Sequence, residues 1–254
     1  MRRPHWVSLR YSKLYWLQKR LRLAAKFNKK DVIEQLISMG VSVNAVNKKN
    51  RSALFHAVAN DNIEAAELLC ANGAEVQHKT NDILFIAIIR NNLEMIIMLL
   101  NYGADLEVKD QNGFDCIRIA CHAGFAKDGN TDSLKYLISI GADMEYRTSR
   151  VDITSLRFCV QFGLVHHALI LLRAGASIIN ATGDNGKSSL LAQCCLSTAP
   201  VAEELLLNFG CDSSEINDKA LLDHVKVASN HFVCLLQYNN FNQWYVDREQ
   251  FCGR

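Results

Sequence analysis

The segment that comes nearest to a catalytic motif spans residues 181–188 and reads Ala-Thr-Gly-Asp-Asn-Gly-Lys-Ser. It loosely matches a phosphate-binding loop, with alanine in place of the first glycine. Such a loop needs a buried strand before it and a helix after it, because backbone N–H groups must surround the phosphates. The preceding Ile178-Ile179 is short for that strand. We therefore interpret the segment as a polar turn, and nucleotide binding that is lost in Lys187→Ala would contradict this interpretation.

Cysteine and histidine are the other residue types that could do chemistry. The tightest group is Cys116, Cys121 and His122, but two helical residues five positions apart point about 140° away from each other. His166 and His167 fall at the start of a predicted helix, where we expect solvent exposure. The nine cysteines include no CxxC pair, which favours buried thiols in a reducing compartment over disulfides. We expect no metal site, no cofactor and no catalytic residue.

Composition and charge narrow the function classes. The chain has 254 residues, of which 49% are hydrophobic and 21% charged, so it is a globular rather than a disordered protein. Residues 1–30 contain ten Lys and Arg and no acid, although the whole chain has a net charge of only +2. The rest is mildly acidic, which argues against nucleic-acid binding. The apolar stretch 83–100 is interrupted by Arg90 and Glu94, and predicts two buried helices rather than a membrane span.

Glycine recurs through the chain with a period near 33 residues. Three and four positions before each of these glycines stands a mostly aliphatic pair, and further upstream a small residue follows an aliphatic one by three positions. The glycines are Gly40, Gly73, Gly103, Gly141, Gly175 and Gly210, and the small residues are Ala24, Ala57, Ala87, Ala120, Cys159 and Cys194. This spacing predicts two antiparallel helices per repeat, the second ended by glycine in a left-handed conformation. One such pair cannot bury its apolar face alone, so the pairs must stack.

This pattern resembles the ankyrin repeat. The family's closing sequence is present at 72–75 (Asn-Gly-Ala-Glu) and at 102–105 (Tyr-Gly-Ala-Asp). Its TPLH start is less similar: residues 52–55 read Ser-Ala-Leu-Phe, and the proline and histidine are absent from every repeat. The resemblance implies an all-α solenoid of stacked helix-turn-helix units, with short β-turn or hairpin fingers between them. It covers residues 19–240.

The domain organisation follows from these repeats. Residues 1–18 form a basic amphipathic leader or cap, residues 19–240 the repeat domain, and residues 241–254 an aromatic tail. The predicted repeats are 19–46, 47–79, 80–109, 110–147, 148–182 and 183–216, and 217–240 forms a degenerate closing pair. The leader could cover the open end of the first repeat, direct the chain to mitochondria, or contact an anionic membrane, an acidic protein or nucleic acid.

The resemblance also implies a function. Ankyrin-type stacks bind proteins on a concave surface made of the fingers and of a palm formed by the first helices. We expect a non-catalytic adaptor that binds a partner protein, with an acidic segment across the basic fingers. By position, the finger residues are Lys48, Lys49, Arg51, His78, Lys79, Lys109, Gln111, Arg147, Arg150, Asp184 and Lys187, and the palm residues are His56, Asn60, Arg90, His122, Phe158 and Gln161.

We expect this adaptor to be a cytoplasmic monomer without a small-molecule substrate, a nuclear location also being compatible with the sequence. The main alternative is an adaptor directed to a membrane or to mitochondria by its basic N-terminal helix. A divergent nucleotide-binding protein is a further alternative, but the chain lacks the alternating strand pattern that such a protein needs.

Overall fold

The repeated spacing produces helix pairs in the computed structural model, which describes residues 5–77, 83–126, 131–147, 153–178, 190 and 206–210. The chain divides into two units, Met1–Val151 and Asp152–Arg254. The described parts contain helices and turns but no strand. None of the described helices is both long enough and apolar enough to cross a bilayer.

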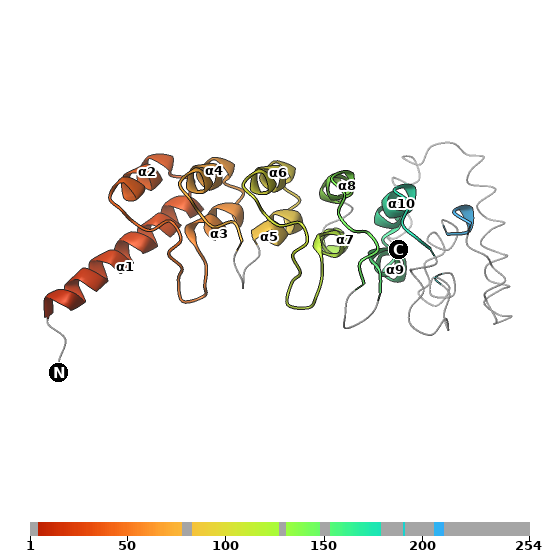
Figure 1. Cartoon of the computed structure of the whole chain (residues 1–254), viewed down its shortest axis with the longest axis horizontal. Helices are drawn as coiled ribbons and strands as arrows, with labels where there is room; N and C mark the ends of the chain where they lie inside the picture. Colours follow the sequence, from red (N-terminus) through yellow and green to blue (C-terminus); the bar gives the residue numbers. More distant parts are fainter. Residues whose placement is uncertain are drawn as a thin grey trace, which may run out of the picture. The chain divides into compact units, whose positions relative to one another are not determined.

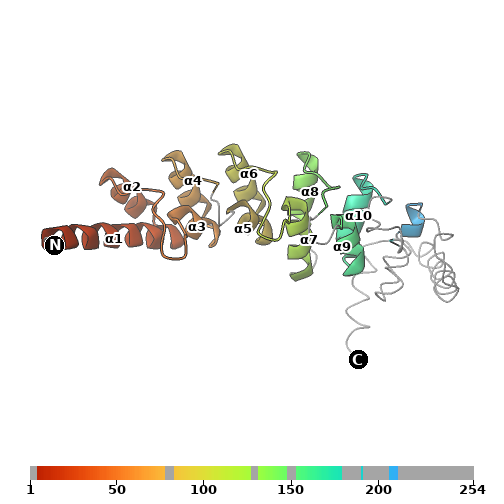
Figure 2. The same cartoon turned by 60° about the horizontal axis from the view of Figure 1, so that its bottom comes forward.

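The first unit contains four helix pairs in two rows (Figures 1 and 2). The row of first helices comprises α1 (His5–Lys26), α3 (Ala53–Val58), α5 (Ile83–Ile89) and α7 (Cys116–Ala126). The row of second helices comprises α2 (Lys30–Ser38), α4 (Ile63–Ala71), α6 (Leu93–Asn101) and α8 (Asp132–Ser139). Each helix packs against its partner in the pair and against the next helix in its row. In the second unit, α9 (Ser155–Gln161) packs against α10 (Val165–Arg173).

The predicted small residues lie where the first helices meet. Ala24, Ala57, Ala87 and Ala120 are all buried. The aliphatic residues three positions earlier, Leu21, Leu54, Leu84 and Ile117, are buried as well. A small side chain at this position lets neighbouring helix backbones approach closely, while the larger one fills the space between the rows. The predicted stacking of the repeats is therefore confirmed in the first unit.

The predicted closing glycines end the second helices. Their φ angles lie between +77° and +94°, a region in which a Cβ atom is strained. In the second repeat, the N–H of Gly73 donates to the carbonyl of Cys70 and that of Ala74 to the carbonyl of Leu69. This pair of bonds is a Schellman motif, which satisfies the last carbonyls of the helix.

A second set of left-handed residues joins the two helices in four of the pairs, those whose connecting turn the structure describes, and the sequence analysis missed it. Asn28, Asp61, Asn91 and Gly163 have φ angles of 51°, 57°, 51° and 66°. Each stands 12 positions before a closing glycine. Asn and Asp tolerate this conformation better than other residues with a side chain, because the short polar group can hydrogen-bond locally.

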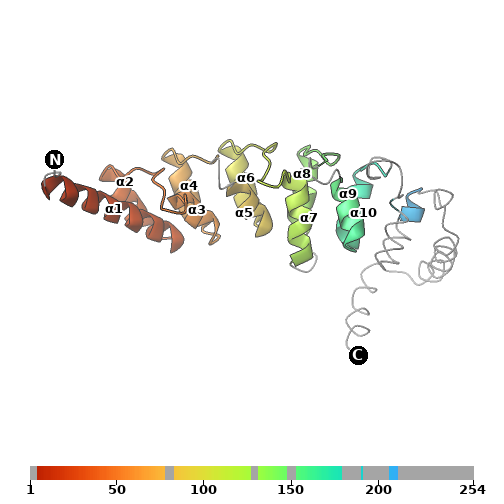
Figure 3. The ribbon, with the colours of Figure 1, turned by 90° about the horizontal axis from the view of Figure 1, so that it is seen from below.

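The first helix differs from the predicted domain boundary. Helix α1 runs without a break from His5 to Lys26, so the division between residues 18 and 19 falls inside it. Its N-terminal part extends past α2 and α3 (Figure 3). The leader and the first helix of repeat one therefore form a single element.

Candidate protein-binding surface

The connections between repeats form fingers that project beside the row of first helices (Figure 1). In the first finger, the Asn47 side-chain oxygen accepts hydrogen bonds from the N–H groups of Lys49 and Arg51, at 2.8 and 3.1 Å. Asp110 makes the same two bonds in the third finger, to Asn112 and Phe114. In both fingers, hydrogen bonds from the tip backbone to an Asn or Asp side chain hold the tip in one conformation. Tips of this kind can present side chains without large losses of entropy on binding.

The first finger carries a group of cations. Lys48 and Lys49 are exposed, and the Arg51 guanidinium lies 4.7 Å from the centre of the Phe55 ring. The Phe55 ring in turn meets the His56 ring edge-on, with 5.6 Å between centres. Stacking on Phe55 fixes the Arg51 charge beside the first turn of α3.

His56 connects this finger to α1. Its pKa is lowered, first because the ring is partly buried, and then because the charges of Arg22, Arg51 and Lys26 disfavour the imidazolium. Every charged group that contributes to this shift is a cation. Arg22 is itself buried, its pKa is lowered by that burial, and it donates a hydrogen bond of 3.4 Å to the carbonyl of Ala45.

We call the set of Arg22, Lys26, Lys48, Lys49, Arg51 and His56 the basic palm. Arg22 and Lys26 were not among the residues predicted from the sequence. They stand two positions before and after Ala24, so the repeat register assigned to α1 could have identified them. Because α1 continues across residues 18 and 19, its C-terminal part contributes to the same surface as the first finger.

The other predicted palm residues have different surroundings. Asn60 is exposed, and its amide donates to the carbonyl of His56 at 2.8 Å. Arg90 pairs with Asp61 of the preceding repeat through its Nε, 2.7 Å from Oδ2, and through Nη2, and this bond raises the pKa of Arg90. Its charge is therefore balanced within the stack. His122 is exposed on α7.

The third and fourth fingers touch through a cation and an aromatic ring. The Lys109 ammonium lies 3.8 Å from the centre of the Tyr146 ring and 3.9 Å from the Glu107 carboxylate. Gln111 is exposed beside it, and Arg147 is half-buried. These fingers are less strongly basic than the first because an acid lies next to the lysine.

Two predicted palm residues lie in the second unit, and one of them is not on the surface. Gln161 is half-buried, but Phe158 is only 6% exposed, and its ring centre lies 4.6 Å from that of Phe162. The position of Phe158, one before the small Cys159, corresponds to that of His56, but here a large ring turns inward. Phe158 is therefore buried at a position where the sequence analysis predicted a contact residue. His78, Lys79, Arg150, Asp184 and Lys187 lie outside the described residues, as does the 181–188 segment.

The described cysteines are buried side chains that pack in the interior of the helix pairs. Cys70, Cys116, Cys121 and Cys159 are buried and form no disulfide, as predicted for thiols that act as small hydrophobic groups. Burial, with a smaller effect of Glu67, raises the pKa of Cys70 to about 12.

His167 is buried, because the position eight before the closing glycine, which Ala65 and Met95 also occupy in their repeats, faces the core. The expectation of a solvated His167 is therefore wrong. No three metal-binding side chains come together among the described residues.

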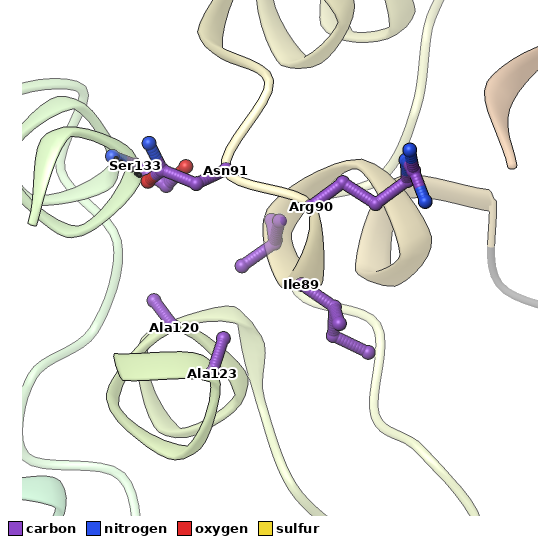
Figure 4. A pocket seen from close by; sticks show the side chains of 7 residues that line it. Ile89, Arg90, Asn91, Ala120, Ala123 and Ser133 are labelled. Atoms are coloured by element: carbon purple, nitrogen blue, oxygen red, sulfur yellow. Dashed lines mark hydrogen bonds between the residues drawn. The ribbon is translucent and has the colours of Figure 1, made fainter. Parts of the chain in front are cut away.

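A small cavity lies between the third and fourth helix pairs (Figure 4). Its volume is about 70 Å³, and it is lined by Ile88, Ile89, Arg90, Asn91, Ala120, Ala123 and Ser133. The Arg90 side chain points away from it, while the Asn91 oxygen accepts a hydrogen bond from the Ser133 N–H at 3.0 Å. Sites for organic ligands usually have volumes of roughly 300 Å³ or more, so this cavity is a packing gap between repeats.

Comparison with known proteins gives the same architecture. A family model described as "Ankyrin repeats (3 copies)" matches residues 21–110. The structure is similar to the human ASB11 ankyrin repeat domain, with a TM-score of 0.61 and 22% identity over 76% of this chain and 84% of that one. It is also similar to the ankyrin repeat domain of Bcl-3, a member of the IkappaB protein family, with a TM-score of 0.69 and 18% identity over 81% of this chain and 97% of that one.

No curated protein sequence matches the chain. The two structural likenesses are below 25% identity and concern the fold alone, whereas the family model rests on the sequence itself. The matched residues contain three of the closing glycines, the C-terminal end of α1, helix α2, and the helix pairs α3–α4 and α5–α6. Residues 21–110 therefore match the ankyrin-repeat family, and the helix pairs of the described residues have the ankyrin-repeat fold.

Proposed function

We propose that this protein is an adaptor that binds an acidic segment of a partner protein on its basic palm. Ankyrin-repeat domains are in general protein–protein interaction modules without catalytic activity. The observation that carries the proposal is the surroundings of His56, where the three charges that lower its pKa, those of Arg22, Lys26 and Arg51, are all positive.

This arrangement favours carboxylates over other groups. Like charges held close together repel each other, and a bound anion would relieve that repulsion. Lys48 and Lys49 are exposed at the finger tip and can donate charge-assisted hydrogen bonds to carboxylates. His56 is half-buried between the finger and α1, so an acid bound there would raise its pKa back towards the ordinary value.

The proposal extends to the location, oligomeric state and ligands of the protein. We infer a cytoplasmic monomer that uses no small-molecule substrate and no cofactor. The four buried thiols support a reducing compartment. Exposed finger residues farther along the first unit, such as Gln111, would extend the contact beyond the basic palm.

Charge reversal at the finger tip tests the proposal. We expect the triple variant Lys48→Glu, Lys49→Glu, Arg51→Glu to lose the proteins that the wild type captures from a cell lysate, as identified by mass spectrometry. The matched control reverses Lys29, Lys30 and Lys135, which lie beside or on second helices and change the net charge equally. Equal capture by the wild type and the finger variant would refute the proposed surface.

A second measurement follows the histidine directly. An NMR titration of His56 in the presence of a captured acidic peptide should show a higher pKa than in its absence. A captured partner that left the titration of His56 unchanged would bind somewhere other than the basic palm.

A further inference from the structure

Helix α1 has two faces of different character. Leu21, Ala24 and Ala25 are buried, and α1 packs on this side against α2 and α3. The opposite side is exposed and carries Tyr15, Trp16, Lys19, Arg20, Leu23, Lys26 and Phe27. All seven are apolar or cationic. The packing of the repeat stack therefore uses one face of the helix and leaves the other accessible.

The exposed face is ordered into a stripe. At about 100° per residue, Leu23, Trp16 and Phe27 lie within about 40° of one another around the helix. They are 43%, 53% and 60% exposed. Lys19 and Lys26 flank this apolar stripe on one side and Arg20 on the other, where its guanidinium lies 4.8 Å from the Trp16 ring centre. We call Trp16, Leu23 and Phe27 the α1 stripe.

The later repeats do not need such a stripe. The position of Phe27, three after the small residue, is occupied by Asn60 in α3's repeat and by Arg90 in α5's repeat. Both of these are polar, as expected for an exposed helix end. The position of Arg20 is occupied by Ala53 and Ile83, which are fully buried. The aromatic and basic residues of α1 are therefore not required by the repeat pattern.

Charge and shape indicate what covers the stripe. Residues 1–30 contain ten cations and no acid, so a second copy of this chain would bring like charges together. Trp16 and Leu23 lie in the C-terminal half of α1 and Phe27 directly follows it, and one exposed helix face suits a flat surface better than a peptide that needs a groove. Trp and Tyr favour the boundary between lipid and water, and Lys and Arg reach from that depth to lipid phosphates.

We propose that α1 lies on an anionic membrane surface, with the α1 stripe inserted between the lipid headgroups and with Lys19, Arg20 and Lys26 at the phosphates. The contact is peripheral, since α1 does not have the apolar length of a spanning helix. By the repeat register, Leu23 and Phe27 occupy the positions of His56 and Asn60, so the α1 stripe continues the row of palm positions onto the terminal helix. The contact leaves the finger tips unused and does not depend on the partner proposed above. Lys26 belongs to both surfaces and is left unchanged in the tests.

Vesicle co-sedimentation with the full chain tests this proposal. We expect the wild type to bind vesicles of phosphatidylcholine with about 30% phosphatidylserine at least about tenfold more tightly than vesicles of phosphatidylcholine alone. The double variant Trp16→Ser, Phe27→Ser should bind the anionic vesicles about tenfold more weakly than the wild type. Lys19→Glu, Arg20→Glu should have a similar effect. The matched control, Lys135→Glu, Arg173→Glu, makes the same charge change at exposed residues of second helices and should bind as the wild type does.

Fluorescence gives a second readout. In a chain with Trp6→Phe and Trp244→Phe, Trp16 is the remaining tryptophan. Its emission should shift to shorter wavelength with anionic vesicles and be quenched by lipids brominated on the acyl chain. The variants should keep the circular dichroism spectrum and melting temperature of the wild type, because the substituted side chains are exposed.

Three results would overturn the proposal. The first is equal binding of the folded Trp16→Ser, Phe27→Ser variant and the wild type to anionic vesicles. The second is failure of the wild type to bind vesicles while the stripe variants lose a protein partner, which would assign the stripe to an acidic protein. The third is equal loss of vesicle binding in the Lys135→Glu, Arg173→Glu control, which would assign the effect to net charge alone.

Discussion

At the scale of single residues, the start of α7 shows how one polar side chain can both support and oppose the fold. Ser52 and Thr154 accept hydrogen bonds from the backbone three residues ahead, at 3.1 and 3.3 Å, and so cap α3 and α9. Asp115 caps α7 in the same way, with a bond of 2.7 Å from the Arg118 N–H. Asp115 is also buried, and that burial raises its pKa to about 6. The geometry of the cap is favourable, but the negative charge is not.

The substitution Asp115→Asn should therefore stabilise the protein at neutral pH. The native carboxyl binds its proton more readily than the carboxyl of the unfolded chain, whose pKa is about 4. The Asp115 contribution to stability is thus present below about pH 4 and is lost as the pH rises through about 6. Because Asn also caps helices, we expect the variant to gain about 2–3 kcal/mol in free energy of unfolding at pH 7.5. Urea unfolding at pH 7.5 and pH 4.5 measures this, and a difference between the two proteins that is the same at both values would contradict it.

At the scale of elements, the left-handed residues of the intra-pair turns also join neighbouring repeats. The Asn28 side-chain oxygen accepts a hydrogen bond from the Ala65 N–H at 3.1 Å, and Asn91 does the same for Ser133 at 3.0 Å. Asn62 reaches back to the carbonyls of Ala25 and Lys26, at 2.9 and 2.8 Å. One turn residue thus sets the backbone of its own pair and the position of the next second helix.

Two substitutions of Asn91 separate these roles. Asn91→Gly keeps the left-handed backbone but loses the bond to Ser133, and should cost about 1 kcal/mol. Asn91→Ala loses the same bond and also forces a Cβ atom into the left-handed region, which should cost about 1–2 kcal/mol more. Thermal unfolding of the two variants and the wild type measures the difference. Equal costs for Ala and Gly would mean that the turn adjusts its backbone without strain.

The same elements show what could be predicted from the sequence. The closing glycines and the small residues were identifiable because one residue type, or one size, recurs at a fixed spacing. The intra-pair turns were missed because Asn, Asp and Gly alternate at that position, and only their shared backbone angle makes them equivalent. The inward turn of Phe158 depends on its contact with Phe162, and the basic palm depends on the unbroken helix α1. Both are properties of packing that spacing does not contain.

At the scale of the whole molecule, charge is distributed unevenly along the chain. The ten cations of residues 1–30 are followed by 18 Lys and Arg against 26 acids in residues 31–254. Both surfaces proposed above use the basic end: the α1 stripe lies on α1, and the basic palm combines α1 with the first finger. The acidic partner proposed above would be attracted to this basic region and repelled by the acidic remainder, which would orient it before contact.

The association rate of the partner should therefore depend on salt and on where the charges lie. We expect the rate constant of the wild type to fall on the order of tenfold as NaCl rises from about 50 mM to about 300 mM, because added ions screen the field. Reversal of Lys48, Lys49 and Arg51 should slow association and flatten this dependence. Reversal of Lys29, Lys30 and Lys135 changes the net charge equally and removes two of the cations of residues 1–30, but none of the three belongs to the basic palm. It should therefore flatten the dependence less than the finger reversal does. Stopped-flow fluorescence with a labelled partner peptide measures the rates. If both triple variants slowed association to the same degree, net charge would be the cause, and the local field of the basic palm would not steer the partner.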